Sequence, residues 1–271
     1  MFLEIFGRVL EVASSSAAVL THLGWVYAGC LLPFPAPAAV RLGLFGDELA
    51  GYTVTVDGAP GAQEAALTAA LLHLDLELLR RPLFLQPRLL GLHAAWAARG
   101  GRAVLLVGEG GCGKSSLCYL LASRGLACGS EEVAAFSGEG LLLPFKRRIM
   151  WKREHPLISR LGIEQDSRNL LAGLDGRFYV LPPGVSWASA GFYDCVFAFL
   201  RYQEGGPDLE TIPLDTMAAL ERLGAASFDL RAMSRDLFAA LVRSLGPERA
   251  VAVNYASLDA AMTFILELVN G

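Results

Sequence analysis

Apolar and polar positions in the first third of the chain switch between strand and helix patterns. Loosely alternating apolar residues at the start favour a strand, and serines at 14–16 can cap the helix that follows. Three prolines between residues 33 and 37 end that helix, because proline lacks the N–H that a helix interior needs. The predicted elements are a strand at 1–12, a helix through about residue 30, a hairpin of strands at 40–45 and 52–56, a turn at 58–61 and a helix at 63–79.

Beyond residue 82, short continuous apolar runs alternate with segments of helical spacing. Continuous apolar runs are typical of strands that are buried on both faces of a sheet. The runs lie at 89–97, 103–107, 126–128, 133–136, 141–143, 178–181, 195–202, 211–214 and 250–254, and the predicted helices at 116–122, 216–223, 234–245 and 257–269. We therefore expect an α/β fold, with a small α+β domain at 1–81 and a larger domain at 82–271.

A glycine-rich loop joins the apolar run at 103–107 to the helix that follows it. Its sequence, Gly-Glu-Gly-Gly-Cys-Gly-Lys-Ser at 108–115, fits the phosphate-binding pattern G-x-x-x-x-G-K-[ST]. In such loops backbone N–H groups face the phosphates, the lysine reaches the β- and γ-phosphates and the serine hydroxyl binds Mg²⁺. The residues expected to bind the nucleotide are Gly108, Glu109, Gly110, Gly111, Cys112, Gly113, Lys114, Ser115 and Ser116.

An ordinary glycine turn is the alternative to a phosphate loop, because the chain contains 29 glycines. The flanking residues favour the phosphate loop. A buried strand before the glycines and a helix directly after them are the context that the motif requires.

Two carboxylates and one histidine are candidates for chemistry beside this loop. Glu131 and Glu132 follow a short strand, where one could hold Mg²⁺ and the other could accept a hydroxyl proton. His93 lies in an apolar run that could pair with the strand before the loop, and it could position the acceptor or a phosphate. From the residues alone, a solvated acidic turn and a structural histidine are the favoured interpretations.

Four segments together resemble the bacterial HPr serine kinase family and its smaller relatives. They are Leu-His-Ala-Ala at 92–95, the strand and phosphate loop at 103–115, Arg-Gly at 124–125 and Ser-Glu-Glu-Val at 130–133. The family has corresponding segments at the same spacings, and it belongs with the phosphoenolpyruvate carboxykinase type of P-loop fold. The similarity is firm over about residues 92–152 and diffuse elsewhere.

This resemblance implies a P-loop kinase domain of the HPr kinase/carboxykinase type that uses ATP and Mg²⁺. It implies that Lys114, Glu132 and His93 are catalytic, with Glu132 as the acid/base group and His93 on the acceptor side. Ser115 and Glu131 would bind the Mg²⁺ ion. The family pair is normally Asp-Asp or Asp-Glu, so Glu131 adds a methylene where Mg²⁺ demands near-octahedral geometry. That departure leaves a binding protein without catalysis open.

The densest basic run of the chain, at 146–153, has two interpretations. Lys146, Arg148 and Lys152 could hold a phosphate or stabilise charge in the transition state, as a similar Pro-Phe-basic segment in the family suggests. Alternatively, the run is a solvated loop. The chain contains only three lysines, two of which lie here, and this scarcity favours a functional interpretation.

Composition restricts the partners and the compartment. With 23 Lys and Arg against 27 Asp and Glu, the formal charge is −4, so we expect no nucleic-acid partner. The five cysteines show no C-x-x-C pair and no metal-ligand spacing, which favours a reduced, cytoplasmic protein. Residues 12–40 contain no Asp, Glu, Lys or Arg, but serines, a histidine and three prolines interrupt them, so we expect neither a membrane span nor a signal peptide.

These observations together predict a kinase that transfers the γ-phosphoryl group of ATP to a hydroxyl. The expected acceptor is a serine of a peptide or small protein, because smaller HPr kinase relatives include tailoring enzymes for ribosomally made peptides such as lasso peptides. A small-molecule kinase acting on free serine or a sugar, and an inactive nucleotide-binding regulatory protein, are the alternatives. The sequence leaves a homo-oligomer open.

Overall fold

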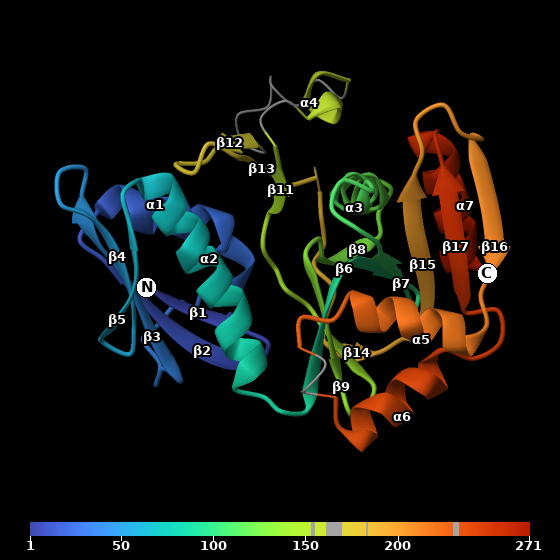
Figure 1. Cartoon of the computed structure of the whole chain (residues 1–271), viewed down its shortest axis with the longest axis horizontal. Helices are drawn as coiled ribbons and strands as arrows, with labels where there is room; N and C mark the ends of the chain where they lie inside the picture. The colour runs from blue at the N-terminus through green and yellow to red at the C-terminus, as the bar shows by residue number, and fades with distance from the viewer. Residues whose placement is uncertain (153–154, 161–169, 183, 230–232) are drawn as a thin grey trace. The chain divides into compact units, whose positions relative to one another are not determined.

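The computed structural model of the protein is mixed α/β and divides into two compact units (Figure 1). Unit 1 comprises 1–86 and 146–181, and unit 2 comprises 87–145 and 182–271. The structure describes residues 1–152, 155–160, 170–182, 184–229 and 233–271. Arg153 of the basic run lies outside the described residues.

Unit 1 is built on a five-stranded sheet with the strands in sequence order. The predicted hairpin is confirmed, whereas the predicted first strand is a hairpin that turns at Phe6 and Gly7, both with positive φ. The predicted turn at 58–61 is confirmed only at Gly58, because a fifth strand begins at Ala59. The elements are β1 (Phe2–Ile5), β2 (Arg8–Ser14), α1 (Ala17–Val26), the 3-10 turn Ala28–Cys30, β3 (Val40–Asp47), β4 (Gly51–Val56), β5 (Ala59–Glu64) and α2 (Leu67–Phe84).

The segment 146–181 packs with unit 1, which corrects the predicted domain division. Its three-stranded sheet consists of β11 (Ile149–Trp151), β13 (Phe178–Val180) and β12 (Leu170–Ala172), and it also contains the short helix α4 (Pro156–Arg160). Arg147 Nη1 lies 2.6 Å from Asp75 Oδ2 on α2, and Arg148 Nε donates to the backbone oxygen of Trp25 on α1. These contacts attach the segment to the helices of unit 1. The predicted boundary at 81/82 falls inside α2.

Unit 2 contains a nine-stranded sheet. Its centre is parallel: β7 and β17 both pair with β15, while β6 runs antiparallel to β7 on the other side. The strands are β6 (Leu89–Arg99), β7 (Arg102–Val107), β8 (Ala127–Ser130), β9 (Val133–Ser137), β10 (Leu141–Leu143), β14 (Gly191–Phe192), β15 (Asp194–Tyr202), β16 (Leu209–Pro213) and β17 (Ala250–Tyr255), in the order β14-β10-β9-β6-β7-β15-β17-β16 with β8 beside β6.

Helices cover both faces of the central strands. The core that includes Leu105 and Phe197 packs against Leu223 of α5 (Thr216–Ala225) and Leu237 of α6 (Arg235–Ser244). Neighbouring strand residues point to the opposite face, and α3 (Lys114–Ser123) and α7 (Leu258–Asn270) pack there. The carboxyl ends of β7, β15 and β17 therefore meet at one edge, which is the usual place for a ligand in such sheets.

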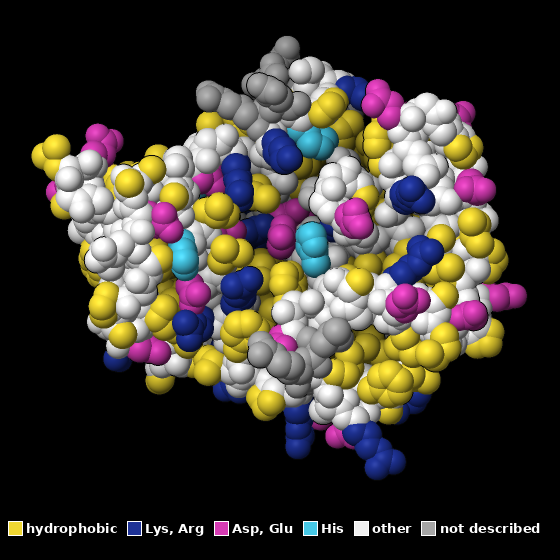
Figure 2. Space-filling model, in the orientation of Figure 1, with side chains coloured by type: hydrophobic (Ala, Val, Ile, Leu, Met, Phe, Trp, Pro, Cys, Tyr) yellow, Lys and Arg dark blue, Asp and Glu magenta, His cyan; other side chains and the backbone are white. Residues whose placement is uncertain are grey.

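Side-chain caps set several helix starts where the sequence predicts them. Ser16, Ser234 and Ser257 each accept a hydrogen bond from the backbone N–H three residues further on. None of the described helices is long and apolar enough to cross a membrane. On the face drawn in Figure 2, basic and acidic side chains are interspersed with apolar ones rather than gathered by sign.

Candidate functional site

The glycine loop of unit 2 connects the end of β7 to the start of α3, as the sequence predicts. Gly113 precedes α3 with a φ of 89°, and Gly111 has a φ of 85°, a region that favours glycine. A Cβ at Gly113 would lie 2.2 Å from the Tyr255 hydroxyl, and one at Gly108 would lie 2.6 Å from the backbone oxygen of Leu200. Glycine is therefore required here both by backbone conformation and by close packing.

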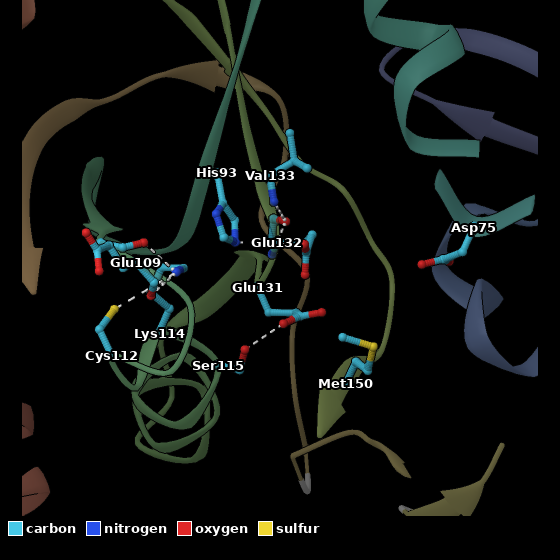
Figure 3. Close-up of polar contacts among 12 residues, drawn as sticks. Asp75, His93, Glu109, Cys112, Lys114, Ser115, Glu131, Glu132, Val133 and Met150 are labelled. Atoms are coloured by element: carbon cyan, nitrogen blue, oxygen red, sulfur yellow. Dashed lines mark hydrogen bonds and ion pairs between the residues drawn. The ribbon is translucent and has the colours of Figure 1, made fainter. Parts of the chain in front are cut away.

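Lys114 is held inside the loop that contains it. Its Nζ donates to the backbone oxygen of Gly108 at 2.6 Å and to that of Glu109 at 2.9 Å, and it lies 3.9 Å from Cys112 Sγ (Figure 3). The side chain is 6% exposed. A buried ammonium group is thus kept within the loop by carbonyl oxygens.

Ser115 connects the loop helix to the predicted acidic pair. Its Oγ donates to Glu131 Oε2 at 2.8 Å, and Glu131 is only 3% exposed (Figure 3). Ser130 shapes the turn that presents both glutamates, because its Oγ accepts from the N–H groups of Glu132 and Val133. Glu131 is therefore not part of a solvated turn, which was the alternative that the sequence left open.

Glu132 and His93 form a second pair next to the first. His93 Nε2 lies 3.8 Å from Glu132 Oε1, and both side chains are partly exposed. His93 lies on β6, whose pairing with β7 confirms the predicted strand neighbour, and its backbone N–H donates to Ala226. The ring of Phe228 lies against the imidazole at 6.1 Å between centroids. A carboxylate and an imidazole thus reach solvent together beside the buried Ser115–Glu131 pair.

Burial and charge set the proton affinity of the groups in this site. Partial burial lowers the pKa of His93 below its ordinary value, the charge of Lys114 lowers it further, and Glu131 opposes both. The neutral form of the imidazole is therefore favoured at pH 7. Burial raises the pKa of the Cys112 thiol, so this loop cysteine stays protonated.

The side chains at the site fit Mg²⁺ in the type of atom they offer. The ion prefers oxygen ligands and keeps several water molecules, so that proteins bind it through one or two carboxylates together with substrate phosphates. The Ser115 hydroxyl and the Glu131 carboxylate are two such oxygens, 2.8 Å apart. Within the described ranges there is no group of three or more His, Cys, Asp or Glu that could hold a metal by itself.

The basic run belongs to unit 1, while the phosphate loop belongs to unit 2. Arg148 is engaged within unit 1: its guanidinium lies 3.5 Å from the centroid of the Trp25 ring, and burial lowers its pKa. Lys152 is exposed and Lys146 is half-buried. The run is thus not one uniform solvated loop, and its predicted role at a phosphate stays a prediction.

The sequence alone does not single out Tyr255. Its hydroxyl donates to the backbone oxygen of Cys112 at 2.6 Å, so a residue 143 positions away holds the phosphate loop. The predicted strand at 250–254 stops one residue before it. The carboxyl end of that strand is the signal that points to Tyr255, because ligand sites form at such ends.

Neither protein-family models nor curated proteins give a match to the chain. The resemblance to HPr kinases therefore stays a prediction that depends on the motifs themselves.

Proposed function

We propose that the protein is an ATP- and Mg²⁺-dependent kinase of the HPr kinase-like P-loop type. It transfers the γ-phosphoryl group to a hydroxyl, and the acceptor is a serine of a peptide or small protein. The proposal extends the predicted roles of the phosphate loop, the acidic pair and His93 to a single reaction.

One contact carries the proposal: the hydrogen bond from Ser115 Oγ to Glu131 Oε2. A serine at this place in a phosphate loop is a ligand for Mg²⁺, and a second oxygen ligand comes from an acidic residue at the end of another strand. Local sequence does not require these two side chains to meet, because they are 16 residues apart and lie on different elements. Their meeting is what a metal-assisted phosphate site needs.

Within this proposal each side chain has a defined task. The loop N–H groups and the start of α3 bind the phosphates, and Lys114 exchanges its carbonyl partners for phosphate oxygens. Glu132 takes the proton of the acceptor hydroxyl while that oxygen bonds to the γ-phosphorus and the bond to the ADP oxygen breaks. Neutral His93 orients Glu132 and the acceptor. Mg²⁺, when bound, neutralises charge that builds up on the phosphates.

The extra methylene of Glu131 is compatible with this task. Its carboxylate already lies at hydrogen-bond distance from Ser115, although the family usually has a shorter aspartate. A kinase is favoured over an inactive nucleotide-binding protein by the partly exposed Glu132–His93 pair, because nucleotide binding alone needs no acid/base group on the acceptor side.

Transfer of label from [γ-³²P]ATP tests the proposal. The protein is incubated with Mg²⁺ and three acceptor sets: serine-containing peptides, free serine and common sugars. We expect label on the peptides and none when Mg²⁺ is chelated. Label on free serine or a sugar alone would replace the peptide kinase by a small-molecule kinase. ATP binding without transfer to any acceptor, and without rescue by Glu131→Asp, would leave a nucleotide-binding regulatory protein.

A further inference from the structure

Tyr255 lies at the last position of β17, next to the phosphate loop but outside it. Its ring is buried, with 1% exposure, and its hydroxyl donates to the backbone oxygen of Cys112. The Tyr202 ring, from β15, packs against it in an edge-to-face arrangement at 5.7 Å between centroids. The phenol is thus fixed by the sheet, and its hydroxyl binds the loop at the Cys112 oxygen.

This contact fixes the orientation of the peptide group between Cys112 and Gly113. In a trans peptide the C=O of one residue and the N–H of the next point in opposite directions. Because the Cys112 oxygen is held by Tyr255, the Gly113 N–H must point away from β17. Gly113 has no Cβ and a φ of 89°, so without this hydrogen bond its peptide group could rotate with little steric resistance.

We infer that Tyr255 is a positioning residue for phosphate binding: its hydroxyl sets the direction of the Gly113 N–H in the loop before any ligand arrives. The inference rests on the proposed function, because it assigns Tyr255 to the same triphosphate site. An N–H group that is already oriented binds an anion without the cost of ordering it on binding.

Other features of Tyr255 agree with a donor that stays protonated. Burial raises the pKa of the phenol, and the neighbouring Cys112 and Tyr202 raise it further. A phenolate could not donate to the Cys112 oxygen, so the environment preserves the group in the form that the contact needs. The close approach of the hydroxyl to Gly113 also explains why no side chain fits at position 113.

The test compares Tyr255→Phe with wild type, using two probes of the loop. Calorimetry measures the binding of ADP and of inorganic tripolyphosphate, each with Mg²⁺. Because the substitution removes one hydrogen bond and keeps the ring, we expect both affinities to fall about 3- to 10-fold, by the same factor. In a transfer assay the KM for ATP should rise by a similar factor, while the KM for the acceptor stays unchanged.

Tyr193→Phe is the matched control. The Tyr193 hydroxyl also donates to a backbone oxygen, that of Ser189 at 2.8 Å, in another part of unit 2. This variant should bind both probes as wild type does. Because the Tyr193 hydrogen bond is exposed and that of Tyr255 is buried, Tyr255→Phe should have the lower unfolding temperature, and binding is measured below both temperatures. A merely structural role for Tyr255 would lower the unfolding temperature and leave the affinity of the folded protein unchanged, which would overturn the inference.

The outcomes separate the inference from the proposed function. If wild type binds both probes and Tyr255→Phe binds them equally well, the inference is wrong and the proposed function stands. If Tyr255→Phe weakens ADP but not tripolyphosphate, the tyrosine acts on the nucleoside, which also overturns the inference. A wild-type protein that binds neither probe would overturn the proposed function, and the inference with it.

Discussion

Each unit holds a carboxylate that is largely shielded from solvent: 17% of the Asp75 side chain is exposed, and Glu131 is 3% exposed. In unit 1, Asp75 accepts a hydrogen bond from the Tyr27 hydroxyl and lies 2.6 Å from the Arg147 guanidinium, which is 2% exposed. In unit 2, Glu131 accepts a hydrogen bond from Ser115 of the phosphate loop. Asp75 thus lies beside an arginine, whereas Glu131 lies beside a hydroxyl from a ligand-binding motif.

The type of partner separates a structural carboxylate from a candidate functional one. An arginine neutralises Asp75 permanently, and the pair attaches the segment 146–181 to α2. At Glu131, the neighbouring Ser115 hydroxyl supplies a second oxygen for a cation. Substitutions around Glu131 should therefore lower the rate of phosphoryl transfer, whereas substitutions around Asp75 should lower the free energy of unfolding.

The largest expected effect is that of Glu132→Gln. Removing the group that accepts the hydroxyl proton should lower the rate of phosphoryl transfer by about 10²- to 10⁴-fold. Nucleotide affinity should stay as in wild type, because the loop is unchanged. Glu139→Gln is the control, since Glu139 lies exposed in a turn of the same unit. A Glu132→Gln protein with wild-type activity would remove Glu132 from the chemistry.

Lys114→Ala should reduce transfer by about 10²- to 10³-fold, the usual loss when one charge-stabilising donor is removed. Unlike Glu132→Gln, it should also weaken the binding of ADP, because the lost ammonium contacts phosphate. Calorimetry with ADP and a labelled-phosphate assay measure the two effects. Undiminished ADP binding in a folded Lys114→Ala protein would contradict the assignment of the loop.

Asp75→Asn should lower the free energy of unfolding by about 3–5 kcal/mol, because it removes the carboxylate charge that lies 2.6 Å from the buried Arg147 guanidinium. Transfer per folded molecule should stay unchanged. The control is Glu11→Gln, which breaks the exposed pair with Arg41 and should cost about 0–1 kcal/mol. Urea denaturation compares them, and equal losses in the two variants would show that burial does not set the difference.

The smallest expected effect is that of His22 on the way the free energy of unfolding depends on pH. Burial lowers its pKa in the folded state, against the opposing charges of Asp175 and Asp75. The unfolded chain therefore binds more protons as pH falls through 6.5, so stability decreases there, by at most about 1.4 kcal/mol per pH unit from this group. His22→Phe should show a smaller loss between pH 7.5 and 5.5 in urea midpoints. An unchanged loss would exclude His22 as a source.

Local chemistry in the sequence predicts those parts of the fold that depend on neighbouring residues. The strand-loop-helix at the phosphate loop and the caps at Ser16, Ser234 and Ser257 follow from residues within one or two turns. The fifth strand of unit 1 does not, because Pro60 and Gly61 are turn residues by composition. They are tolerated because β5 is an edge strand, which needs hydrogen bonds on one side only.

Long-range pairing accounts for what the sequence does not predict. Arg147 meets Asp75 across 72 positions, so no local pattern shows that the segment 146–181 packs with unit 1. At the candidate site, the resemblance implies that Ser115 and Glu131 both bind the Mg²⁺ ion, but no local pattern brings the two side chains together. That contact depends on the pairing of β6 with β7, β8 and β9, which brings the end of β8 beside the loop helix.

The Mg²⁺ dependence of nucleotide binding tests the central claim most directly. Calorimetry would follow a non-hydrolysable ATP analogue with wild type and Glu131→Gln over a series of Mg²⁺ concentrations. We predict that Mg²⁺ strengthens binding to wild type and that Glu131→Gln needs about 10- to 100-fold more Mg²⁺ for the same gain. Binding that responds equally to Mg²⁺ in both proteins would contradict a metal site at Ser115 and Glu131.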